Sequence, residues 1–319
     1  MAEIQTGILL ATNRGLYEPG HAEPSAFSGM HVAGLTVDGT TVHAVVGRHE
    51  IWRTEASVGA LRDATWEKVA RVEHQAVALC RRPGALLVGT QEAHLLRIGR
   101  GDGGQGNNAS PLDSFEEAPG RDEWFTPWGG PPATRTIDTA DDGDLFVNVH
   151  VGGILRSTDN GESWQQTIDI RTDVHQVLFH DATGMIFAPS ARGFAESSDR
   201  GGSWTVTTAG LDFPYMRAVA IAGDTILASA SNGPHGDRGA VYSRPIGSRE
   251  PFARCTAGLP EWFSGNVDTF CLEAGGGATE EIAVIAAPGG TVYLSEDGAR
   301  HWREIASGLP QINAVAIAD

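Results

Sequence analysis

Short apolar runs separated by turns follow one another along the whole chain. Each run consists mainly of aliphatic, β-branched or aromatic residues, as strands that are buried on both faces do. Gly, Asp and Asn turn positions bound the runs, for example at Val37-Asp38-Gly39. The clearest runs are 42–46, 85–88, 145–149, 225–228 and 282–286. Helical periodicity is confined to 61–69, so the pattern predicts an all-β protein.

A turn motif occurs twice between these runs, as STDNGESW at 157–164 and SSDRGGSW at 197–204, with a weaker copy at 295–302. In such a turn the Ser and Asp side chains accept hydrogen bonds from backbone N–H groups, and Gly supplies a positive φ. The Trp that ends the motif then buries a large ring. We therefore interpret Asp159 and Asp199 as structural, and Trp164 and Trp204 as buried packing residues. A second turn, Ala-Gly-Leu or Ser-Gly-Leu, repeats at 209–211, 257–259 and 307–309.

The S-x-D-x-G-x-[ST]-W pattern resembles the Asp-box (BNR) repeat. The third copy departs from it, because Gly298 stands one place early and His301 replaces Ser or Thr. Proteins with this repeat are β-propellers and include sialidases, sortilin-type receptors, xyloglucan hydrolases and photosystem assembly factors. The resemblance implies a propeller whose Asp boxes lie away from the ligand-binding face. It does not imply a true sialidase, since the Arg-Ile-Pro motif of that family is absent near the N-terminus.

Seven segments align as the first, innermost strands of propeller blades, each with four strands. They begin near His31, Gln75, Arg135, His175, Arg217, Asp268 and Asn313. The last segment has no room for further strands, and residues 1–20 supply a second strand at 7–12 and a third at 15–17. The sequence therefore predicts one domain over 1–319, a single seven-bladed β-propeller whose last blade is closed by both termini.

The seven starting positions are all polar, whereas the positions two residues further on, from Ala33 to Val315, are all apolar. Strand starts at a wet channel mouth are polar in any case, which is one interpretation. The other is a binding ring in which His31, His175 and Asp268 are candidate catalytic groups. In that ring, Arg135, Arg217, Gln75 and Asn313 are candidate ligand-binding groups, because guanidinium grips carboxylate or phosphate.

Aromatic residues add to this predicted mouth. Glu-Trp-Phe occurs at 123–125 and again at 261–263, in loops that enter first strands. Exposed aromatic clusters are contact surfaces, although such loops also fold their rings into the core. We expect four rings around the entrance: Trp124, Trp128, Trp262 and Phe263.

Imidazoles from consecutive blades point to a metal as an alternative. Neutral imidazole suits iron, copper, zinc or nickel, but no local ligand spacing supports a site here. The candidate ligands are His31, His74, His150 and His175. No cofactor is predicted apart from such a metal at the channel mouth.

Composition narrows the class of partner. The net charge of −17 argues against a nucleic-acid binder, whose affinity rests on neutralising phosphates, and against a polybasic membrane contact. The start shows no basic segment followed by an apolar run, no stretch is long enough to span a membrane, and three cysteines make no disulfide framework. These features predict a cytoplasmic protein.

Two functions from different classes follow. The first is a binding or assembly module that takes a small polar or anionic ligand, glycans included, or a protein partner on the top face. The second is a hydrolase or lyase that uses the His/Arg/Asp ring, with or without a metal. Fold alone does not decide between them, and the sequence leaves open whether the protein is an enzyme.

Overall fold

The computed structural model describes residues 7–99, 109–275 and 281–318. These residues form seven antiparallel sheets, six of them with four strands and one with three. Within these ranges, helical structure is limited to α1 (Asp113–Glu116) and the short 3-10 helices η1 (Leu61–Asp63), η2 (Arg121–Glu123) and η3 (Ile170–Thr172). The all-β, seven-blade prediction is confirmed. No helix in the described ranges is long and apolar enough to cross a membrane.

The chain separates into two compact units. The first comprises Met1–Arg48, Trp52–Lys68 and Thr208–Asp319, and the second His49–Ile51 and Val69–Thr207. The organisation as one domain stays a prediction.

Four sheets belong mainly to the first unit. Their strands are β1 (Gly7–Thr12), β2 (Gly15–Tyr17) and β27 (Ile312–Ala318); β3 (Val32–Asp38), β4 (Thr41–Val46), β5 (Glu50–Glu55) and β6 (Glu67–Arg71); β19 (Tyr215–Ala222), β20 (Thr225–Ser231), β21 (Gly239–Pro245) and β22 (Ala253–Arg254); and β23 (Leu272–Ala274), β24 (Ala283–Ala287), β25 (Thr291–Ser295) and β26 (Arg303–Ala306).

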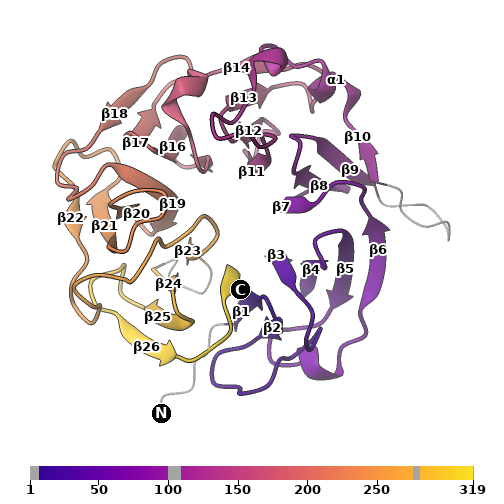
Figure 1. Cartoon of the computed structure of the whole chain (residues 1–319), viewed down its shortest axis with the longest axis vertical. Coiled ribbons are helices and arrows are strands. Elements are labelled where there is room, and N and C mark those ends of the chain that lie inside the picture. The colour runs from indigo at the N-terminus through magenta and orange to yellow at the C-terminus, as the bar shows by residue number, and fades with distance from the viewer. Residues whose placement is uncertain (1–6, 100–108, 276–280, 319) are drawn as a thin grey trace. The chain divides into compact units, whose positions relative to one another are not determined.

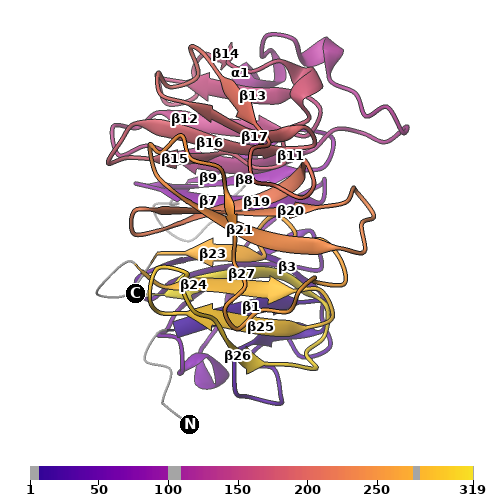
Figure 2. The same ribbon diagram turned by 90° about the vertical axis from the view of Figure 1, so that its left-hand side faces the viewer.

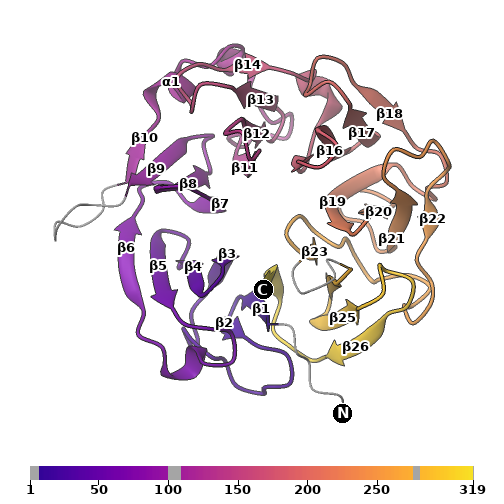
Figure 3. The ribbon, with the colours of Figure 1, turned by 180° about the vertical axis from the view of Figure 1, so that it is seen from behind.

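The second unit holds three sheets, and in each the strands follow one another in sequence order. Seen from behind, β7, β8, β9 and β10 lie side by side in this way (Figure 3). The strands are β7 (Ala76–Arg82), β8 (Ala85–Thr90), β9 (Leu95–Gly99) and β10 (Ala109–Pro111); β11 (Thr134–Thr139), β12 (Leu145–Val149), β13 (Gly153–Ser157) and β14 (Gln165–Gln166); and β15 (Leu178–His180), β16 (Met185–Ser190), β17 (Gly193–Ser197) and β18 (Thr205–Thr207).

Both ends of the chain build the sheet β2-β1-β27, in which β1 lies between the other two (Figures 1 and 2). Ile8 pairs with Ile317 and Leu10 with Val315 in antiparallel register. The predicted closing blade is therefore confirmed, although residues 1–6 of its predicted segment lie outside the described ranges. Pairing of this kind covers an edge that would otherwise stay open.

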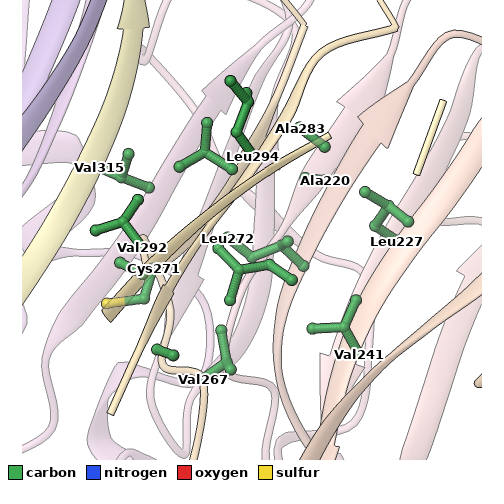
Figure 4. Close-up of a cluster of buried hydrophobic side chains, with 14 of the residues drawn as sticks. Ala220, Leu227, Val241, Val267, Cys271, Leu272, Ala283, Val292, Leu294 and Val315 are labelled. Atoms are coloured by element: carbon green, nitrogen blue, oxygen red, sulfur yellow. The ribbon is translucent and has the colours of Figure 1, made fainter. Parts of the chain in front are cut away.

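The core lies where the sheets face one another, and the second strands form its centre. All five residues of β12 and all five of β24 are buried, which explains why both strands are apolar apart from Asn148 of β12. In the first unit, Leu272 of β23 packs with Leu227 and Val241 from one neighbouring sheet and with Val315 of β27 from another (Figure 4). Burial of each such aliphatic side chain contributes about 1.5–3 kcal/mol.

Five first strands carry a β-bulge near their start, which the sequence pattern does not reveal. The register shifts at Val32/Gly34 in β3, and corresponding shifts interrupt β7, β11, β19 and β27. A bulge inserts one unpaired residue and re-aims the side chains around it. Ala33 and Val77, two of the apolar positions that follow the predicted strand starts, are the unpaired residues of their bulges and are half-buried.

Two other first strands begin later than expected. β15 starts at Leu178 and β23 at Leu272, so His175 and Asp268 precede their strands. Left-handed backbone at Phe270 (φ 67°) accounts for the late start of β23, since this conformation does not continue a strand.

The motif turns have the predicted hydrogen bonds. Ser157 Oγ donates to Asp159 Oδ1 (2.8 Å) and accepts from the Gly161 N–H (2.8 Å), while Asp159 Oδ1 accepts from the Ser163 N–H (2.9 Å). The copy at 197–204 repeats this geometry with Asp199 and Ser203. Trp164 is buried and Trp302 of the weaker copy is too. Trp204 is only half-buried, which corrects the expectation for that ring.

These turns predict a stability loss in acid. The Ser163 hydroxyl and then the backbone N–H groups hold the pKa of Asp159 at about 2, and Ser203 does the same for Asp199. Because folding lowers these pKa values, the stability they provide is present above the unfolded value of 3.8 and is lost as pH falls towards 2. Thermal melts at pH 6 and pH 3 should therefore differ less for the Asp159→Asn/Asp199→Asn variant than for wild type. The control Asp63→Asn, outside the turns, should behave as wild type, and an unchanged difference in the double variant would contradict the assignment.

Candidate functional site

In the first unit, the structure joins two predicted ring residues to each other. Arg217 Nη1 donates to Asp268 Oδ1, and Arg217 Nη2 donates to the carbonyl oxygen of Pro234 (2.9 Å). The guanidinium and carboxylate thus largely neutralise one another. This pairing weakens the case for Asp268 as a catalytic base and for Arg217 as a free anion-binding group.

His31 and Asn313 lie in the same unit. Asn313 Nδ2 donates to the carbonyl oxygen of Val32 (2.8 Å), next to His31 in the chain, so this amide supports the backbone. Burial, and then the charge of Arg48, lowers the pKa of His31. Its imidazole is therefore neutral at pH 7 and able to accept a proton or bind a metal.

The second Glu-Trp-Phe segment serves packing. Phe263 is buried in the core, and its backbone pairs with Gly239. The half-buried Trp262 lies under the guanidinium of Arg254, with 3.8 Å from Cζ to the ring centroid. Phe213 packs against it at a centroid distance of 5.5 Å, with the two ring planes tilted by 50°. Neither ring projects freely as an entrance residue would.

The first Glu-Trp-Phe segment, in the second unit, and the residues after it contain both a buried ring and exposed rings. Trp124 is buried against Phe115 (5.7 Å between centroids) and Arg121 (5.1 Å). Phe125 and Trp128, by contrast, are exposed to solvent, with 59% and 64% of their surface accessible. An exposed pair of large rings is unusual unless it meets a ligand or partner.

Phe125 and Trp128 line a pocket of about 810 Å³ in the second unit. Four loops form it: those before β11 and β15, and the turns β12–β13 and β16–β17. Apolar walls come from Pro127, Val151 and Ile170. The charged lining residues are Asp122, Glu123, Arg171, Asp173 and Arg192. The loop types are those expected on one face of a propeller, and Trp128 is the predicted residue that lines the pocket.

Two predicted imidazoles meet beside this pocket. His150 Nε2 lies 3.5 Å and His175 Nε2 3.7 Å from Asp173 Oδ1. The two rings are 5.7 Å apart, and Trp128 packs on His150 at 5.3 Å. The His175 side chain is fully buried, so it is no direct contact for a large ligand.

A second cluster in this unit brings together His74, Glu92 and His94. The two imidazole rings lie 4.3 Å apart with their planes tilted by 35°. His94 Nδ1 pairs with Glu116 (2.9 Å), which also contacts Arg121. Glu92 is more than half exposed. These contacts are those of a surface polar network.

The two remaining predicted ligand-binding residues, Gln75 and Arg135, are half-buried at the starts of β7 and β11. Arg135 stands at the bulge of β11. Because the predicted site residues are divided between the two units, their convergence on one ligand stays a prediction.

Sequence reasoning missed Asp173, Phe125 and Val151. Asp173 ends η3 in a left-handed conformation, and this turn alone brings its carboxylate back to His175. Val151 has φ 57°, which is rare for a β-branched residue and marks strain beside a site. Only their positions in the sequence could have indicated them, because each lies within two residues of a histidine or tryptophan that the sequence analysis names as a candidate site residue.

Comparison with known proteins identifies no family model and no curated protein that matches the sequence. Solved structures do match. The WD40 β-propeller domain of Doa1 aligns with TM-score 0.62, 12% identity and coverage of 95% of this chain and 88% of that one. YCF48 bound to D1 peptide aligns with TM-score 0.58, 14% identity and coverage of 95% and 85%.

An ancestral GH74 enzyme aligns with TM-score 0.61 and 13% identity over 90% of this chain, which spans only 38% of the enzyme. At these identities the likeness concerns the fold alone. Together with the seven sheets, it shows that the chain is a seven-bladed β-propeller.

Proposed function

We propose that this propeller is a recognition module that binds a peptide segment of a protein partner in the pocket of the second unit. The observation that carries the proposal is the exposure of Phe125 and Trp128 on the pocket wall. Trp and other large rings dominate binding energy when a partner desolvates them.

The pocket lining specifies the kind of segment. Pro127, Val151 and Ile170 offer an apolar surface for one or two side chains. Arg171 and Arg192 lie at the same pocket, and guanidinium pairs with carboxylate in bidentate geometry. The segment should therefore present an apolar or aromatic side chain with an acidic group beside it. The neighbour solved with a bound peptide supports this class of ligand.

The enzymatic alternative receives less support. Of its candidate catalytic residues, His175 is fully buried and Asp268 is paired with Arg217. A binding role requires neither group to react.

The test is selection of peptides from a random phage-displayed library against the whole protein. Selected peptides should share an apolar residue next to Asp or Glu. Isothermal titration should show that Trp128→Ala weakens their affinity about 10- to 100-fold, the loss of about 1.4–2.8 kcal/mol typical of a hot spot. Arg192→Ala should weaken it about tenfold.

Met30→Ala is the matched control, because Met30 is an exposed apolar residue outside the pocket. It should leave the affinity unchanged. Selection of no peptide, or of peptides indifferent to Trp128→Ala, would refute the proposal. Binding of a small aromatic carboxylate alone would restrict the pocket to small ligands.

A further inference from the structure

We propose that His150, Asp173 and His175 form a binding site for one zinc ion. The inference is independent of peptide recognition, because it rests on these three side chains and their backbone support. Each offers one ligand atom, and the three atoms lie within 4.8 Å of one another.

The spacing of the ligand atoms fits a tetrahedral metal. Zinc bonds of about 2.0–2.1 Å place neighbouring ligand atoms roughly 3.3 Å apart. In the structure, Asp173 Oδ1 lies 3.5 Å from His150 Nε2 and 3.7 Å from His175 Nε2. These distances are too long for good hydrogen bonds yet only a few tenths of an ångström longer than the zinc spacing. A small inward movement would complete the coordination.

Backbone hydrogen bonds hold these ligands in place. The carbonyl oxygen of Asp173 accepts from the Ala191 N–H (3.0 Å), and its N–H donates to Ile170 (3.2 Å). The His175 N–H donates to the carbonyl oxygen of Pro189 (2.9 Å). The ligands thus come from two loops, and the loop of Asp173 and His175 is fixed by hydrogen bonds to β16 and the turn that follows it. This support lowers the entropic cost of capturing an ion.

The donor set selects the kind of metal. Two imidazoles and one carboxylate suit zinc, whereas calcium and magnesium prefer oxygen alone. The site is sheltered, since His175 is fully buried and the side chains of His150 and Asp173 are 21% and 25% exposed. Three protein ligands leave a fourth position free, and Asp173 also lines the pocket. The free position would thus be reached from the pocket, by water or by a carboxylate.

The other cluster, at His74, Glu92 and His94, provides an internal control. It offers the same ligand types, two imidazoles and one carboxylate, but the Glu92 side chain is 56% exposed, so this cluster lacks the shelter of the cluster around Asp173. We therefore assign zinc to the cluster around Asp173 alone.

The experiment is isothermal titration of the full-length protein with zinc chloride after removal of metals by a chelator. Wild type should bind one zinc ion per chain, and its melting temperature should rise by several degrees. His150→Gln and Asp173→Asn, both at partly exposed positions, should each weaken zinc binding at least 100-fold. His94→Gln should bind zinc as wild type does. Cobalt(II) in place of zinc should give the visible absorption of a tetrahedral site, absent in His150→Gln.

Melting of the metal-free variants establishes that they are folded, and if Asp173→Asn fails this check, His150→Gln decides. Zinc binding that is absent in wild type overturns the assignment. So does binding that survives His150→Gln, or binding that disappears in His94→Gln. None of these readouts uses a peptide, so the zinc site and the recognition function fail separately.

Discussion

Deletion of residues 312–319 is expected to lower the melting temperature by roughly 10 °C or more and to remove cooperative unfolding of the first unit. The deletion removes β27, the partner strand of β1. Leu9, Leu10 and Ala11 of β1 are fully buried, and they would lie next to an open edge.

Packing adds to the loss of strand pairing. Val315 is buried in the cluster that contains Leu272 of the neighbouring sheet, and its N–H donates to the carbonyl oxygen of Phe270 (2.8 Å). Losing each aliphatic side chain of this kind costs about 1.5–3 kcal/mol before the exposed backbone is counted.

Differential scanning calorimetry of the truncated protein measures the effect. A synthetic peptide of residues 310–319 should restore part of the lost stability, because an extended segment can re-form the missing strand of the sheet. A truncated protein that melts as wild type does would mean that β27 contributes nothing to this sheet.

Strand positions were predictable because their signal is local. Largely apolar runs such as 145–149 predict strands buried on both faces, and the structure places all of β12 in the core. The closing sheet was predictable by elimination, since the last first strand had no partners left in the chain after it. The bulges were not predictable, because one extra residue in a strand leaves its apolar composition unchanged. Ala33 and Val77 are the unpaired residues of two such bulges, and both are half-buried.

The candidate site was less predictable because it depends on loop conformation. Trp124 and Trp128 stand four residues apart in one loop, but the first is 7% exposed and the second 64%. Nothing in their sequence context separates them. Asp173 reaches His150 only because it adopts a left-handed conformation after η3. Sequence spacing reveals the imidazoles, whereas the carboxylate between them requires three-dimensional structure.

The repeated Gly-Leu turns explain a sequence feature that has no chemical role. In the second copy, the Trp302 N–H donates to the carbonyl oxygen of Ala257 (2.9 Å), so the turn docks on the end of the next motif. Gly258 has φ 83°, and a Cβ there would overlap the carbonyl oxygen of Trp302. Gly308 in the third copy has φ 71°, but a Cβ there would meet nothing within 4 Å.

These two glycines therefore make a matched pair with the same backbone requirement and different surroundings. Gly308→Ala should cost only the left-handed strain, about 1–2 kcal/mol. Gly258→Ala adds a steric clash with backbone that cannot rotate away, and overpacking of this kind costs a further ~1–3 kcal/mol. Urea denaturation should thus show Gly258→Ala to be the less stable variant by about 1–3 kcal/mol in the free energy of unfolding. If both variants lost the same stability, Gly258 would be required only for its positive φ, and the contact of the turn with Trp302 would not restrict the size of the residue at this position.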